Sequence, residues 1–370
     1  MEAALPLLNA AAIGGFAVSA NVLLKPQPSV SAPELYCYGA LAVVSLTYLL
    51  GFFGVQIAWD ALGGSKKPSA TPTDFGSLLK SAIVWPAIVW FPLYMTYLGG
   101  HERHFLPGWW EDGAGADFFG WEALRHAPSP LGLTLGLLAV LVGMVPVVLY
   151  HAMRRGGFLG SLRPIQKEGA PQYNFWEGLV THLSQPSGFA LLGGYLIGTW
   201  MFNLMPPSYY TYDQGINWWH VAAQLLVQDF IQFLGHYAEH RVSKAFYRIS
   251  HKAHHNFTNP RIFDAFSAAS VDTVCMILIP LFLTAWIVPA NVWSYMTFGS
   301  LFANWLTMIH SEYAHPWDLM FRAIGLGTAA DHHVHHKTFK YNFSHLFLYW
   351  DRAAGTYRDP KDVRSFNEGV

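Results

Sequence analysis

Charge and cysteine are both scarce in this 370-residue chain. Charged residues make up 12% of it, which is about half the share usual in soluble proteins. The two cysteines, Cys37 and Cys275, both lie in apolar runs, so the sequence excludes a disulfide framework and zinc-finger spacing. The formal net charge is −1, and no polyanionic partner such as nucleic acid is implied.

Targeting signals are also absent from the two ends of the sequence. The chain opens MEAALPLL, with Glu2 where a secretory signal would carry positive charge, and it lacks the Arg and Ser bias of a transit peptide. The last residues, RSFNEGV, match no retention or lipidation motif. The sequence therefore predicts neither a cleaved secretory signal nor a lipid anchor.

Apolar and aromatic residues are abundant instead. Hydrophobic residues make up 52% of the chain, with 15 Trp and 18 Tyr, as is typical of proteins anchored at membrane interfaces. A spanning helix needs about 20 apolar residues. Five stretches contain no Asp, Glu, Lys or Arg: Tyr36–Trp59, Ser81–Gly100, Leu131–Tyr150, Ser187–Tyr212 and Thr273–Ile309.

These stretches predict several membrane spans. Each of the first four suits one span, whereas Thr273–Ile309 is too long for one and holds Pro289-Ala290-Asn291 near its middle. That stretch predicts a helical hairpin of two short spans. Gly215–Gly235 is a further candidate that is charged only at Asp229, and Ala3–Leu24 is a marginal one.

The loop charges predict which side of the membrane each segment faces. Loops 60–80, 151–186 and 236–267 are basic, whereas loop 101–130 is acidic. Because cytoplasmic loops carry an excess of Lys and Arg, the basic loops are expected in the cytosol, and alternation places residues 310–370 there too.

The predicted fold is therefore an all-α, polytopic integral membrane protein with a cytosolic histidine-rich helical cap over the spans. Residues 1–170 are expected to form an N-terminal membrane region of three to four spans. Residues 171–360 are expected to form the histidine-rich domain, and 361–370 a polar tail.

Twelve of the 18 histidines lie between His236 and His345. Eleven of them form the groups HYAEH (236–240), HKAHH (251–255), HSEYAH (310–315) and HHVHH (332–336). Positions i, i+3 and i+4 share one face of a helix, so three groups present their histidines together, and His333 points elsewhere. His310 and His315 would lie about 140° apart on a helix. Either the helix ends between them, as Pro316 permits, or one of them is not a ligand.

Clustering on one predicted membrane face favours metal binding over scattered interfacial histidines. The ten candidate ligands are His236, His240, His251, His254, His255, His310, His315, His332, His335 and His336. Ten exceed the four ligands of a zinc site and suit two five- or six-coordinate ions. Imidazole suits iron, copper or zinc. Ligation by histidine alone, with open positions beside lipid, favours a two-iron, oxygen-activating centre.

Three carboxylates are expected beside these ligands. Asp229 lies two turns before His236 on the same face, where it could accept a hydrogen bond from a metal-bound histidine or make a structural contact. Asp331 could do the same or serve as the N-cap of the last group. Glu239 completes His236-x-x-Glu239-His240, the inverted zinc-protease pattern, in which it would be a general base.

Two alternatives to an oxygenase therefore remain open. A membrane metallopeptidase would use Glu239 but leaves the other clustered histidines without a role. A non-catalytic metal-binding membrane protein, for iron transport or storage, would favour histidines or carboxylates within the spans, whereas these cluster at predicted span ends.

HYAEH, HKAHH and HHVHH, in this order, resemble the histidine boxes of the fatty acid hydroxylase/sterol desaturase superfamily. DFIQFLGHYAEH and DHHVHHKTFKYNFSHLFLYWDRAAGTYRDP extend the resemblance over about residues 215–360. It implies a non-haem di-iron enzyme of the endoplasmic reticulum membrane, with the ten histidines as ligands facing the cytosol. Such enzymes use O2 and electrons from NAD(P)H, often delivered through cytochrome b5.

HSEYAHPWD followed by GLGTAADHHVHH most resembles the sterol C-5 desaturase (lathosterol oxidase-like) branch. This branch implies a sterol substrate and hydrogen abstraction that yields an alcohol or a double bond. Other branches share the boxes: sterol C-4 methyl oxidases, sterol 25-hydroxylases, and fatty-acid, sphingolipid or alkylglycerol hydroxylases.

Overall fold

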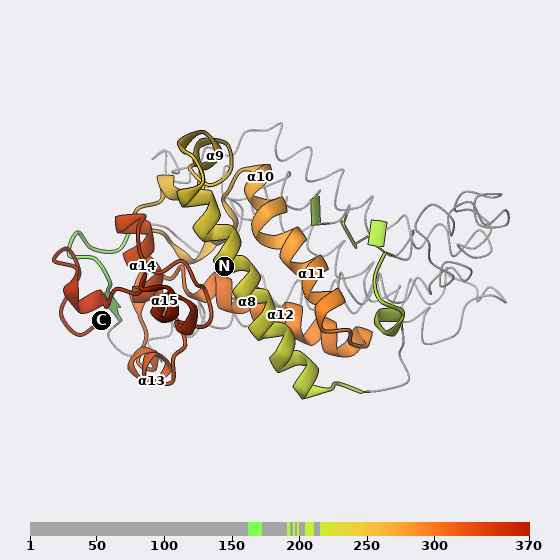
Figure 1. Ribbon diagram of the computed structural model, residues 1–370. Coiled ribbons are helices and arrows are strands. Elements are labelled where there is room, and N and C mark those ends of the chain that lie inside the picture. Colours follow the sequence, from blue (N-terminus) through green and yellow to red (C-terminus); the bar gives the residue numbers. More distant parts are fainter. Residues whose placement is uncertain (1–161, 172–190, 193–194, 197, 200–203, 211–214) are drawn as a thin grey trace, which may run out of the picture. The chain divides into compact units, whose positions relative to one another are not determined.

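The computed structural model describes residues 162–171, 191–192, 195–196, 198–199, 204–210 and 215–370 (Figure 1). The spans predicted within residues 36–150 and the loops 60–80 and 101–130 lie outside the described residues, as does most of the span predicted at 187–212. The chain divides into two compact units, residues 1–138 with 192–210 and residues 139–191 with 211–370. The domain bounds at 170 and 360 remain predictions.

Few residues of the first unit are described. They include the short 3-10 helix η3 (Pro207–Tyr210). The Thr199 hydroxyl donates to the carbonyl of Tyr195 at 2.8 Å, and the Tyr195 hydroxyl lies 3.9 Å from the Met205 sulfur. These contacts link Tyr195 with Thr199 and Met205.

The described part of the second unit is rich in helix, as the sequence predicts. Its α-helices are α8 (Trp218–Arg241), α9 (Lys244–Ile249), α10 (Ser270–Thr273), α11 (Ile279–Ile287), α12 (Val292–Met308), α13 (Asp318–Ala323), α14 (Ala329–Thr338) and α15 (Tyr349–Ala354). Shorter turns are η4 (His254–Asn256), η5 (Ile262–Phe266), the π-helical η6 (Val274–Leu278) and η7 (Pro360–Asp362). Two-residue strands β1 (Arg163–Pro164) and β2 (Tyr313–Ala314) pair antiparallel, with Arg163 opposite Ala314.

Helix α8 is the longest element of the described part. The Asn217 side chain caps its start by accepting hydrogen bonds from the backbone N–H groups of Trp219 and His220. The helix packs against α11 and α12, and Figure 1 shows it running beside α11. Its buried face repeats every four residues as Gln224, Gln228, Gln232 and His236. The helix therefore brings its last two histidines to the end where α9 and α14 lie.

One continuous helix, Ser270–Ile287, joins α10, η6 and α11. Within the described residues it alone is long and apolar enough to cross a membrane. The next helix, α12, begins after Asn291, whose side chain accepts a hydrogen bond from the N–H of Ser294. The helices therefore break near Pro289-Ala290-Asn291, as predicted, while the polytopic arrangement and the cytosolic cap remain predictions.

Glutamines on α8 bind α8 to that apolar helix. The Gln232 amide donates to the carbonyl of Met276 in the π turn, and the Gln224 amide donates to the carbonyl of Val288 at 3.1 Å. The Thr284 hydroxyl donates to Gln228 at 3.0 Å. A π turn and a helix end both leave backbone carbonyls without regular helical partners. The two glutamine amides donate hydrogen bonds to these carbonyls, which lipid could not do.

A small apolar core surrounds α14. Its buried members are Ile165, Ala329, Ala330, Val334, Val363, Phe366 and Val370. Segment 162–171 therefore packs against the histidine-rich region. Its strand β1 adds a second contact by pairing with β2. Residues 361–370, predicted from the sequence as a polar tail, place Val363, Phe366 and Val370 in this core.

Candidate metal centre

The structure gathers histidines into two groups that are buried except at the half-buried His240. The first group is His236, His240, His251, His255 and His335, and the second group is His254, His310, His332 and His336. Within each group, one ring nitrogen of every member lies within 4.8 Å of those of all the others. Nine of the ten predicted ligands are therefore brought together, and His315 lies outside both groups. Metal binding by the nine stays a prediction.

Two short segments, residues 251–255 and α14, supply members of both groups. The end of α8 supplies His236 and His240, and the neighbours His254 and His255 of η4 enter different groups. Helix α14 is divided in the same way: His335 joins the first group, and His332 and His336 join the second. The helical spacing predicted a shared face, and the structure shows that this face divides between two adjacent groups.

The Nε2 atoms of the grouped histidines approach one another closely. In the first group, the Nε2–Nε2 distances are 2.9 Å for His236–His251, 3.1 Å for His240–His255 and 2.9 Å for His255–His335. In the second group they are 3.2 Å for His254–His310, 3.0 Å for His310–His332 and 3.1 Å for His332–His336.

Hydrogen bonds at the opposite nitrogen fix which tautomer several rings adopt. Backbone carbonyls accept from Nδ1 of His236, His310, His335 and His336, at distances of 2.7, 2.6, 2.9 and 2.8 Å. A carbonyl can only accept, so each Nδ1 carries the proton and each Nε2 presents a lone pair to its group. Metal-bound histidines in proteins are held in this way.

These lone pairs suit a metal ion. Burial lowers the pKa of His240 and of His254 to about 4, and the pKa values of the other grouped histidines fall well below the usual value for the same reason. The rings are therefore neutral. Where two Nε2 lone pairs face each other, as in His236 and His251 at 2.9 Å, they repel unless a cation lies between them, and a nitrogen-only donor set suits iron, copper or zinc.

Asp229 makes a structural contact with the backbone, which is the second of the two roles that the sequence left open. Its carboxylate accepts hydrogen bonds from the backbone N–H groups of His345, Leu346 and Phe347, at 3.1, 2.7 and 2.7 Å. Two helical turns separate Asp229 from His236 by about 10 Å along α8, which is too far for a hydrogen bond. Asp229 instead anchors the loop 343–347, whose first carbonyl holds His236.

Two other carboxylates take roles that the sequence reasoning missed. Asp272 accepts the Nδ1–H of His251 at 2.7 Å. Asp351 accepts from the N–H groups of Phe343 and Ser344, at 2.9 and 2.8 Å, on the far side of the same loop. Asp272 is an acid at the start of an apolar helix, and the reasoning that singled out Asp229 could have found it.

Glu239 lies beside Nδ1 of His251, at 3.4 Å, next to Asp272. Burial raises the pKa of this carboxyl group to about 7. It therefore lies behind His251, on the side away from the Nε2 atom that faces the first group. The metallopeptidase alternative needs Glu239 as a general base on the side where His236 and His240 would bind the metal. Glu239 does not lie on that side.

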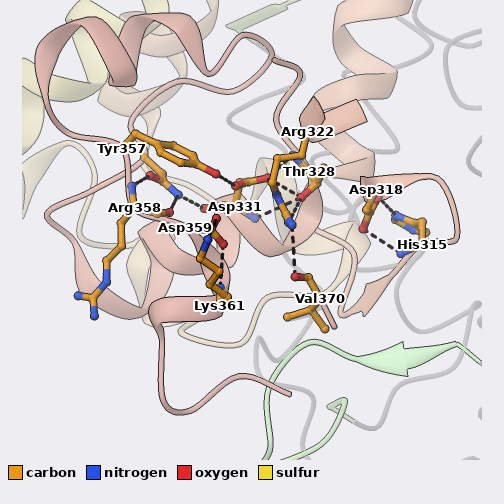
Figure 2. Close-up of polar contacts among 11 residues, drawn as sticks. His315, Asp318, Arg322, Thr328, Asp331, Tyr357, Arg358, Asp359, Lys361 and Val370 are labelled. Atoms are coloured by element: carbon orange, nitrogen blue, oxygen red, sulfur yellow. Dashed lines mark hydrogen bonds and ion pairs between the residues drawn. The ribbon is translucent and has the colours of Figure 1, made fainter. Parts of the chain in front are cut away.

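Asp331 organises the start of α14 without touching a grouped histidine (Figure 2). The N-cap is Thr328, whose hydroxyl and N–H both donate to Asp331, at 2.6 and 3.1 Å. Arg322 donates to the same carboxylate at 3.1 Å, and the Tyr357 hydroxyl donates at 3.3 Å. Asp331 is therefore the third residue of the helix in a capping box, rather than its cap or a partner of a ligand.

The two remaining histidines of the sequence groups lie elsewhere. His333 is buried and points away from both groups, and its Nδ1 lies 3.2 Å from the Gln166 amide nitrogen. His315 stacks on Trp317 with ring centroids 5.1 Å apart, and its Nδ1 lies 3.3 Å from the Asp318 carboxylate (Figure 2). The chain turns after His310, where α12 has ended, and this turn separates the pair.

Comparison with known proteins agrees with this arrangement. The family model described as fatty acid hydroxylase matches residues 221–356. An alternative squalene epoxidase of Phaeodactylum tricornutum is 51% identical over 296 residues, which cover 78% of this chain and 83% of that protein. A cholesterol 25-hydroxylase-like protein of Danio rerio is 31% identical over 37% of this chain and 55% of its own length. A Delta(7)-sterol 5(6)-desaturase of Leptosphaeria maculans is 30% identical over 31% of each chain. No solved structure matches.

The chain belongs to the fatty acid hydroxylase/sterol desaturase superfamily, which confirms the resemblance of the histidine boxes. It is an oxidoreductase of a family of iron-dependent oxygenases whose relatives include enzymes of sterol metabolism. These relatives indicate a membrane protein with a lipid substrate.

Proposed function

We propose that this chain is a membrane-bound di-iron monooxygenase that transfers one oxygen atom of O2 to a double bond of squalene and forms the epoxide. The observation that carries the proposal is the convergence of nine neutral histidines into two adjacent groups. The proposed substrate follows the relative from Phaeodactylum tricornutum, which covers most of both chains.

Extent of similarity favours squalene over a sterol. The sterol 5(6)-desaturase match covers 31% of the chain. The match to the alternative squalene epoxidase spans 296 residues and must continue well into the N-terminal membrane region. The similarity to this relative extends beyond the histidine boxes, and residues outside the boxes can determine which substrate is selected. Desaturation of a sterol at C-5, favoured by HSEYAHPWD and GLGTAADHHVHH, is the second candidate.

The reaction balances with an external reductant. One alkene, one O2, two electrons and two protons give one epoxide and one water. Iron, when bound by the two groups, supplies reversible one-electron chemistry and the activation of O2. The protein holds five of the imidazoles in fixed tautomers through backbone carbonyls and Asp272, and it buries all of the grouped imidazoles except that of the half-buried His240.

An apolar substrate would enter from the bilayer. Leu226, Phe230 and Leu234 on α8, and Leu283 and Ile287 on α11, are exposed. Exposed apolar side chains on these two helices suit contact with lipid, and α8 ends at the first group. Squalene would then reach the metal from within the bilayer, without passing through water.

Electrons would arrive at α9. Between His240 and Asp264 the sequence holds no acid, and Arg241, Lys244, Arg248 and Lys252 are exposed there. The Tyr247 ring lies 5.1 Å from that of His240 and 6.1 Å from that of His255, so one aromatic ring separates this basic surface from the first group. The surface fits an acidic one-electron carrier such as cytochrome b5, supplied from NAD(P)H on the cytosolic side of the endoplasmic reticulum.

Labelled oxygen tests the proposal. Membranes containing the chain, from cells whose own squalene epoxidase has been removed, would be incubated with squalene, NADPH and 18O2. Mass spectrometry should find squalene epoxide carrying one 18O atom, and His254→Ala should abolish it. Absence of epoxide, with a new double bond in an added sterol instead, would favour the second candidate.

A further inference from the structure

His345 is the buried histidine that stands between the two groups. It lies in the loop 343–347 and is 7% exposed. Its ring stacks on that of His236, with centroids 5.0 Å apart and planes at 21°, and lies 5.3 Å from the ring of His332. It therefore touches one member of each group, although its position falls outside the spacing of the histidine boxes.

The backbone of His345 is held firmly in place. Its N–H donates to Asp229 at 3.1 Å, and its carbonyl accepts from the indole of Trp305 at 3.2 Å. A Cβ atom at Gly327 would lie 2.8 Å from this carbonyl, so the loop can approach the start of α14 because residue 327 is glycine. Two helices and a glycine turn thus fix the position of this one residue.

One ring nitrogen of His345, Nδ1, is buried without a hydrogen-bond partner among the described residues. Buried polar atoms are generally paired with protein, water or an ion, so an unpaired ring nitrogen beside a group of metal-binding type needs an explanation. A metal ion bonded to that nitrogen supplies one.

Ring orientation indicates which group His345 can join. The rings of His345 and His236 are almost parallel, so their in-plane lone pairs run side by side and do not meet at one ion. The ring of His332 is tilted by 45° to that of His345, which permits the lone pairs to converge. The first group already has five members, whereas the second has four.

We propose that His345, and not His315, supplies the tenth nitrogen ligand, and that it binds the metal of the second group through Nδ1. This inference rests on the proposed two-metal function. Neither residue is a member of the two groups, but the His345 ring lies against one member of each group, whereas His315 lies against Asp318 and Trp317. The centre then has five histidines for each metal.

Metal binding of two matched variants tests this assignment. Purified wild-type protein, His345→Ala and His315→Ala would be loaded with Fe2+, and iron per chain and the Mössbauer spectrum would be measured. His345→Ala should hold the second iron at least about 10-fold more weakly. The doublet of the other iron should persist, and added imidazole should restore the missing one. His315→Ala should keep two irons with the wild-type spectrum.

Two further measurements keep the test decisive. His345→Gln preserves a polar side chain of similar size and should show the same iron loss if the alanine variant does not fold. Titration with Co2+ reports the number of nitrogen-bound sites independently of any enzymatic activity. Two irons with an unchanged spectrum in both His345 variants would overturn the assignment, as would loss of one iron in His315→Ala. Wild-type protein that binds no iron yet loses one of two Co2+ sites on His345→Ala would refute the function and leave the ligand assignment intact.

Discussion

Replacing Asp229 by asparagine should loosen the metal centre from a distance. Its carboxylate accepts three backbone N–H groups of the loop 343–347, at 3.1, 2.7 and 2.7 Å. If the asparagine oxygen keeps the bonds from His345 and Leu346, its NH2 group faces the N–H of Phe347, and two donors then oppose each other. One charge-assisted bond is lost and two are weakened, which costs about 3 kcal/mol.

The strain is transmitted to the first group through the loop. The carbonyl of Phe343, at the start of the loop, accepts the Nδ1–H of His236 at 2.7 Å. Loss of such support to a metal-bound histidine typically costs about 10- to 100-fold in metal affinity. Asp229→Asn should therefore bind iron about 10-fold or more weakly than wild type.

Competition with a calibrated Fe2+ chelator, on protein in the same detergent, measures this affinity. The exposed Asp362 offers a matched control, since Asp362→Asn removes a solvent-facing carboxylate outside the loop and should leave iron affinity unchanged. Wild-type affinity in Asp229→Asn, with an unaltered melting temperature, would show that the loop does not hold His236 in place.

Three other outcomes follow from the same contacts. Asp272→Ala should weaken iron binding about 10- to 100-fold, because the Nδ1–H of His251 loses its acceptor at 2.7 Å. Wild-type iron affinity in this variant, measured by chelator competition, would contradict the expectation. Joint reversal by Lys244→Glu and Arg248→Glu should raise the KM for an acidic electron donor about 10-fold at low salt. Reduction by dithionite should be unaffected, and Lys361→Glu serves as control; equal KM values in all variants would exclude α9 as the docking surface. Metal-free protein should melt at a lower temperature at pH 5.5 than at pH 7.5. Burial keeps the pKa of the grouped histidines below 6.5, so the unfolded chain binds more protons and stability falls as pH drops through that value. A melting temperature independent of pH would contradict this.

Local spacing was sufficient to predict much of the fold and the site. The separation of His236 from His240 matched one helical face, and both lie at the end of α8. Pro289-Ala290-Asn291 marked the break between α11 and α12, because proline and a capping asparagine both oppose a continuous helix. Nine of the ten histidines singled out in the sequence are brought together.

Tertiary contacts account for what spacing did not predict. His254 and His255 are adjacent in sequence, yet the tight turn of η4 sends them to different groups. The helical face of Asp229 left a histidine contact and a structural contact both open, and its partners are the amides of a loop more than a hundred residues away. Phe366 of the expected polar tail packs on α14. Contacts of this kind depend on where the chain returns in space, which helical periodicity does not contain.

Metal content tests the central claim most directly. The chain, purified from iron-replete cells in detergent without added chelator, would be assayed for all transition metals by mass spectrometry, with protein quantified by amino-acid analysis. The two histidine groups predict two iron ions per chain and O2 consumption upon reduction. One tightly bound zinc ion per chain, with no iron and no O2 consumption, would contradict the account.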